Sequence, residues 1–111
     1  MVDEDWETLF NSEIVKAEQA RSEGNEGKAR VCARRAAGQV IGEYLRRQGV
    51  RPPGRSAYNR LQYLHSLTNT SPQVREVAGH FLMRITPEHT LPVETDLVGK
   101  ARWLKQTLLG D

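Results

Sequence analysis

The sequence predicts an all-α protein, an up-and-down bundle of about five helices. Apolar side chains recur at intervals of three and four residues along most of the chain, which is the spacing of one helical face. Short stretches rich in glycine and proline separate these segments, and none of the segments alternates like a strand. At 111 residues the chain has room for one modest core, so we expect a single domain over 1–111.

The first two predicted helices form an antiparallel hairpin. Residues 4–23 place apolar side chains on one face, namely Trp6, Phe10, Ile14, Ala17 and Ala20. The polar turn Gly24-Asn25-Glu26-Gly27 ends this helix and opens into a long second helix over 28–48. The apolar stripe of the second helix is made of alanines in its first half, and such small residues let neighbouring helices approach closely. We therefore expect this segment to be the central helix.

Three shorter helices are predicted after the break at Gly49–Arg55, whose paired prolines cannot continue a helix. Ser56 is a candidate N-cap for a short helix that carries three leucines, Leu61, Leu64 and Leu67. Ser71 and Pro72 suit the N-cap and the first position of a fourth helix, whose apolar face runs to Ile85.

The last helix is predicted over 94–109. A loop over 86–92 precedes it, and Gly110 suits its C-terminal end.

Composition excludes several classes of protein. No apolar run approaches the roughly 18 residues that a membrane-spanning helix needs. The start, Met1–Trp6, is acidic where a secretory signal would be basic and then apolar, so we expect a cytoplasmic protein with no membrane partner. The single cysteine, Cys32, can form no internal disulfide, and no second cysteine lies near it to begin a zinc site. We expect neither a metal nor a cofactor.

Charge is strongly segregated along the hairpin, although the formal net charge is only +2. Residues 1–26 are mainly acidic. Residues 28–60 contain Glu43 as their one acidic residue, against Lys28, Arg30, Arg34, Arg35, Arg46, Arg47, Arg51, Arg55 and Arg60. One interpretation is that an acidic helix lies against a basic one and the charges pair weakly at the surface. The other is that the arginines form a phosphate-binding face, for which we select Arg34, Arg35, Arg46 and Arg47.

Each of the three histidines follows an arginine by five positions, as His80 follows Arg75. A histidine that titrates near neutrality can move the proton of an RNA 2′-hydroxyl, and an arginine can stabilise the charge that develops on the phosphate. This pattern suggests metal-independent RNA cleavage. Five residues of helix turn through about 140°, so such a pair reaches one groove only from its two sides. The alternative is that each histidine is a structural residue.

Taken together, these segments resemble the HEPN family (higher eukaryotes and prokaryotes nucleotide-binding domain). The resemblance spans roughly residues 6–109 and lies in pattern and order. The matching segments are Gly24-Asn25-Glu26-Gly27-Lys28-Ala29, the Ala- and Arg-rich stretch 33–45 with Gly49 after it, the three leucines of the short helix, and Lys100-Ala101-Arg102-Trp103-Leu104.

The HEPN resemblance implies a helical bundle that dimerises. Many members carry an Arg-x4–6-His ribonuclease motif or act beside a minimal nucleotidyltransferase in toxin–antitoxin pairs. Arg75 and His80 are the best carriers of that motif here, although Glu76 stands where the family commonly has Asn, His or Asp. In a second alignment, Arg84-Ile85-Thr86-Pro87 matches the Arg-Tyr-Pro element of members that lack the motif.

Three functional hypotheses follow. The first is a HEPN-like homodimer that binds RNA or nucleotide, with a nucleotidyltransferase as its partner protein. The second is a toxin ribonuclease that uses Arg75 and His80. The third is a protein-interaction scaffold, because the hairpin also resembles one helix pair of a tetratricopeptide repeat; no second such unit recurs in the sequence. For the dimer we expect an interface on the fourth and fifth helices that covers Phe81, Trp103 and Leu108.

Overall fold

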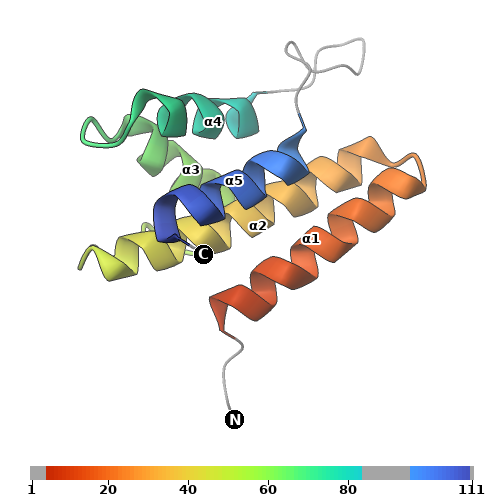
Figure 1. The fold of residues 1–111 in the computed structure, drawn as a ribbon, viewed down its shortest axis with the longest axis horizontal. Coiled ribbons are helices and arrows are strands. Elements are labelled where there is room, and N and C mark those ends of the chain that lie inside the picture. The colour runs from red at the N-terminus through yellow and green to blue at the C-terminus, as the bar shows by residue number, and fades with distance from the viewer. Residues whose placement is uncertain (1–4, 84–95, 111) are drawn as a thin grey trace.

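The computed structural model describes residues 5–83 and 96–110 (Figure 1). This part of the chain contains five helices and no strand, which confirms the all-α prediction. The helices are α1 (Trp6–Ser22), α2 (Glu26–Arg47), α3 (Ala57–Ser66), α4 (Pro72–Leu82) and α5 (Leu97–Leu109).

Each helix begins at a side chain that caps it. The side chains of Asp5, Asn25, Ser56, Ser71 and Asp96 each accept a hydrogen bond from the backbone N–H three residues further on. The predicted caps Ser56 and Ser71 are therefore confirmed, and so is Gly110, which ends α5 with a φ of 75°. Because Asn25 caps α2, this helix begins two residues earlier than predicted. The predicted limits at Ile85 and Glu94 lie outside the described residues.

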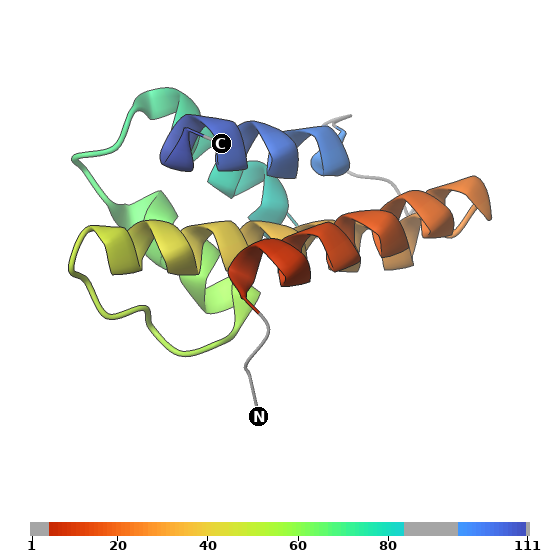
Figure 2. The ribbon, with the colours of Figure 1, turned by 60° about the horizontal axis from the view of Figure 1, so that its bottom comes forward.

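Helix α2 is the centre of the molecule, and three other helices pack against it. It runs antiparallel to α1, while α5 lies along both and runs in the same direction as α2 (Figure 1). Turned by 60°, the ribbon shows α5 and α4 on one side of α2 (Figure 2). The alanines of α2 make this close packing feasible, since Ala33, Ala36 and Ala37 have no exposed surface.

Two glycines of α2 let α3 cross it closely. A Cβ atom at Gly38 would lie 2.8 Å from the Cβ and 2.9 Å from the Cα of Ala57. A Cβ at Gly42 would meet the guanidinium of Arg60, with its Cζ at 2.8 Å. Arg60 donates to the carbonyls of Gly38 and Gly54, both at 3.0 Å, and its burial lowers the pKa of its side chain. Arg60 thus ties α3 to α2 and to the loop before it.

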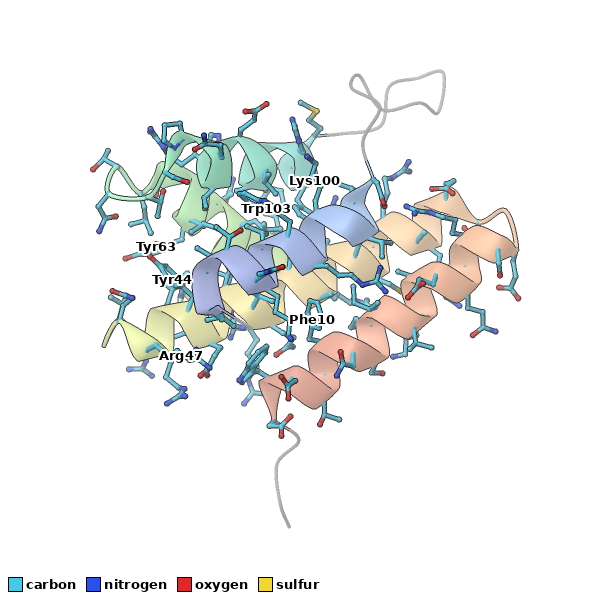
Figure 3. The ribbon with its side chains drawn as sticks, viewed as in Figure 1. Phe10, Tyr44, Arg47, Tyr63, Lys100 and Trp103 are labelled. Carbon is cyan, nitrogen blue, oxygen red and sulfur yellow. The ribbon has the colours of Figure 1, made fainter. Side chains whose placement is uncertain are left out.

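The chain buries more of its apolar surface than its length led us to expect. Phe81 is 1% exposed and Leu108 packs against the core, so neither depends on a second copy for burial. Trp103 on α5 keeps 36% of its surface exposed (Figure 3). The homodimer stays a prediction. None of the described helices is long and apolar enough to cross a membrane.

We expect Gly38→Ala to lower the free energy of unfolding by about 1–3 kcal/mol, because the new methyl group would overlap the backbone of Ala57. Gly27→Ala is the matched control: its Cβ would meet only the Asn25 Oδ1 at 3.8 Å, so we expect a gain of about 0.5–1 kcal/mol from helix propensity. Urea midpoints measure both effects. Equal free energies of unfolding for the two variants would show that α2 and α3 can shift enough to accommodate the added methyl group without a loss of stability.

Candidate nucleic-acid interface

Two acidic residues of α1, Glu7 and Glu18, pair with α5 in this structure. The Arg102 Nη2 lies 2.6 Å from the Glu18 Oε1, and the Lys105 Nζ lies 3.7 Å from the Glu7 Oε2. By contrast, Arg30, Arg34 and Arg35 of α2 make no ion pair with a carboxylate of the described residues. Charge pairing within the hairpin therefore does not account for the arginines in the first half of α2.

The second half of α2 uses its arginines to hold Glu43. Arg46 donates to both carboxylate oxygens of Glu43, at 2.7 and 2.6 Å, and Arg47 donates to Oε2 at 2.8 Å. Glu43 is only 6% exposed, and the hydrogen bonds from Arg46 are the main cause of its lowered pKa. Arg47 also donates to the Leu109 carbonyl at 3.3 Å and lies 6.0 Å from the ring centre of Trp6 (Figure 3). We call Glu43, Arg46 and Arg47 the carboxylate clamp.

The four arginines predicted to bind phosphate thus do not form one site. Arg34 and Arg46 lie about 18 Å apart along the axis of α2 and about 120° apart around it. Arg46 and Arg47 are committed to the clamp, which joins α2 to the end of α5. Arg35 is exposed on the first half of the helix, and Arg34 is half-buried there.

Arg34 lines a groove in the described part of the chain, with a volume of about 340 Å³. We call it the basic groove; α2, α3 and α4 all contribute to it, through Gly27, Arg30, Val31, Arg34, Tyr58, Leu82 and Met83. The Nε of Arg34 is shielded from solvent and has no hydrogen-bond partner. Such a buried donor costs free energy while it lacks an acceptor. The guanidinium of Arg34 makes no ion pair with a described carboxylate, so its charge is available to an acceptor such as a phosphate oxygen that enters the groove.

Sequence reasoning missed the apolar part of this groove. Val31 and Tyr58 are each 41% exposed and both line the groove, so they give it an apolar surface. Val31 lies three residues after Lys28 and three before Arg34, so an apolar side chain interrupts a basic helical face, and that interruption was the available signal. Tyr58 stands three residues before Leu61 and continues the spacing of the leucines, so nothing in the spacing marks it as exposed. The association of Tyr58 with α2 depends on the crossing at Gly38, which no local pattern indicates.

The predicted cleavage pair lies on α4, and neither Arg75 nor His80 lines the basic groove. His80 is half-buried, with its Nε2 3.9 Å from the Glu76 Oε1. The Nδ1 of His80 and the Nε of Arg75 are both buried without a hydrogen-bond partner. Five residues of helix place the two side chains about 140° and 7.5 Å apart, so α4 alone does not bring them together. The alternative element, Arg84-Ile85-Thr86-Pro87, lies outside the described residues.

The described residues contain no cluster of three or more His, Cys, Asp or Glu side chains that could hold a metal ion. Cys32 is buried, and this burial, together with the nearby Glu13, raises the pKa of its thiol. A thiol in that state is a poor nucleophile.

Comparison with known proteins gives no further guidance. No protein-family model matches the chain, and neither the curated proteins nor the solved structures include a match.

The carboxylate clamp should make stability depend on pH. We expect Glu43→Gln to lower the free energy of unfolding by about 1–3 kcal/mol at pH 7, because a buried charge-assisted hydrogen-bond network is lost. The pKa of Glu43 is lowered in the folded protein, so its stabilisation is complete above the unfolded pKa of about 4.3 and disappears as the pH falls through the folded pKa.

Urea unfolding of wild type and variant from pH 7 down to pH 3 measures this difference. Glu18→Gln, which removes an exposed ion pair, is the control and should cost less than about 1 kcal/mol at any pH. If the difference in free energy of unfolding between wild type and Glu43→Gln stayed constant across the pH range, the ionised Glu43 would not be the source of the stabilisation.

Proposed function

We propose that this protein binds RNA or nucleotides through the basic groove. The observation that carries the proposal is that Arg30 and Arg34 line one groove and make no ion pair with a carboxylate of the described residues. Arginine suits this role because its planar group can donate two parallel hydrogen bonds to one phosphate. The HEPN resemblance of the sequence supports the same ligand class.

The location of the groove favours an anion. It runs along the first half of α2, and Gly27 lies in the first turn, where the helix dipole adds partial positive charge. Lys28 and Arg35 are exposed on the same half of the helix and make no ion pair with a described carboxylate. A polyanion that enters the groove would therefore meet several cations that are not already neutralised.

The proposal extends to partners on the strength of the resemblance. A homodimer is supported by the exposed Trp103 of α5, and the HEPN pattern favours a minimal nucleotidyltransferase as the partner protein in a toxin–antitoxin pair. The competing interpretation of the hairpin as a tetratricopeptide-like scaffold predicts protein binding without salt-dependent affinity for RNA.

We expect the double variant Arg30→Gln/Arg34→Gln to weaken binding of a short RNA by about tenfold or more, because two charge-assisted contacts are lost. The slope of log affinity against log salt should flatten by about 1.4, since each lost phosphate contact to a single strand removes about 0.7. Fluorescence anisotropy at several salt concentrations measures both quantities.

The matched control is Arg21→Gln/Arg102→Gln, which removes the same charge from arginines that are held in ion pairs outside the groove. The affinity of this control variant for the RNA should stay within about twofold of that of wild type. Equal losses in the two double variants would indicate a general charge effect and would exclude the groove as the site.

A ribonuclease that uses Arg75 and His80 is the second candidate function. It is favoured by the buried Nε of Arg75 and Nδ1 of His80, neither of which has a hydrogen-bond partner. Such a pair would need RNA to bridge it, or a second copy to complete it, because the two side chains leave α4 in different directions.

We expect His80→Ala to lower the rate of RNA cleavage by about 10²–10⁴ if the imidazole is a general acid or base. His65→Ala, on the exposed end of α3, is the control and should keep full activity. Wild-type protein that cleaves no RNA, with or without a chelator, would exclude a self-sufficient nuclease and leave RNA binding as the function.

A further inference from the structure

We infer that the basic groove takes one unpaired base together with its phosphate: the base stacks on the ring of Tyr58, and the phosphate binds Arg30 and Arg34. This inference rests on the proposed function and adds the part of the nucleic acid that is recognised. The same chemistry is offered by a single RNA strand and by a free mononucleotide.

The two walls of the groove differ in chemistry. Arg30 and Arg34 leave adjacent turns of α2, whereas Tyr58 on α3 and Leu82 and Met83 at the end of α4 are apolar or aromatic. Phosphate alone would need only the cationic wall. A nucleotide has an anionic phosphate and a flat apolar base, so it can use both walls at once.

Tyr58 is placed as a stacking surface. Its ring is 41% exposed although it borders the groove, and its hydroxyl accepts a hydrogen bond from the Gln62 Nε2 at 3.3 Å. Gln62 is one turn further along α3, so this contact stays within that helix. A tyrosine ring has only two side-chain torsions, so it loses little entropy when a base stacks on it.

The size of the groove selects an unpaired base. Its volume of about 340 Å³ is at the lower end of the range for small-molecule sites, about 300–1,000 Å³. Duplex RNA keeps its bases stacked inside the helix, and its deep groove is inaccessible to side chains, so duplex could reach only the arginines. The inference therefore predicts a preference for single strand over duplex that depends on Tyr58.

The test compares Tyr58→Leu with Tyr58→Phe. Leucine removes the ring and keeps apolar bulk, while phenylalanine keeps the ring. The ligands are a six-nucleotide RNA, the same RNA as a duplex, and a copy in which every base is removed and the phosphates are kept. We expect Tyr58→Leu to weaken single-strand binding by about 5- to 150-fold, the range for one base stacked on an aromatic ring, and Tyr58→Phe to bind within about twofold of wild type. Thermal unfolding of each variant checks that the fold is kept.

The abasic strand should bind wild type as weakly as the intact strand binds Tyr58→Leu. Displacement of the RNA by millimolar AMP would support the inference and assign the site to free nucleotides as well. If AMP does not displace it, a single-strand preference that Tyr58→Leu abolishes supports the inference for a strand alone.

Equal binding of intact and abasic strands, or wild-type affinity in Tyr58→Leu, would overturn the inference. The proposed function would survive that result as long as Arg30→Gln/Arg34→Gln still weakened binding. If wild type bound neither RNA nor AMP at low salt, both the inference and the proposed function would be overturned.

Discussion

The close approach of other helices to α2 is the constraint on which the rest of the structure depends. Alanines line its contacts with α1 and α5, and Gly38 gives the N-terminus of α3 room to touch its backbone. A larger residue at any of these positions would separate the helices, because protein interiors have few voids to absorb the volume. The same crossing brings Tyr58 beside Arg34, so the basic groove is a consequence of how tightly α2 is packed.

The arginines of α2 fall into two groups. Arg46 and Arg47 donate hydrogen bonds to a buried carboxylate and, within the described residues, the arginines of the first half of the helix do not. Glu43 is almost completely removed from water, and leaving it there without partners would be costly, so Arg46 and Arg47 are fixed against it. No carboxylate of the described residues performs that function for Arg30 and Arg34. Arg30 and Arg34 are therefore more available to a ligand than Arg46 and Arg47, although all four lie on the same helix.

Much of the fold could be predicted because its signals are local. The caps at Ser56 and Ser71 and the helix end at Gly110 follow from short-range hydrogen bonding and backbone freedom, which neighbouring residues determine. The candidate site was predicted only in part. Arg34 was included, but Arg46 and Arg47 were grouped with it because charge counting does not show which arginine has a buried partner.

The all-α class, the order of the helices and the excess of positive charge on α2 could all be derived from the amino-acid sequence, since periodicity, capping and charge are properties of contiguous residues. Tertiary structure decided where that charge is free to act. The ion pairs of α1 with α5 and the placement of Tyr58 and Arg34 along one groove join groups through helix packing. The pairing of Arg46 and Arg47 with Glu43 lies within α2 and depends on packing for the burial of Glu43. Such contacts depend on crossing geometry and burial, which a single linear pattern does not specify.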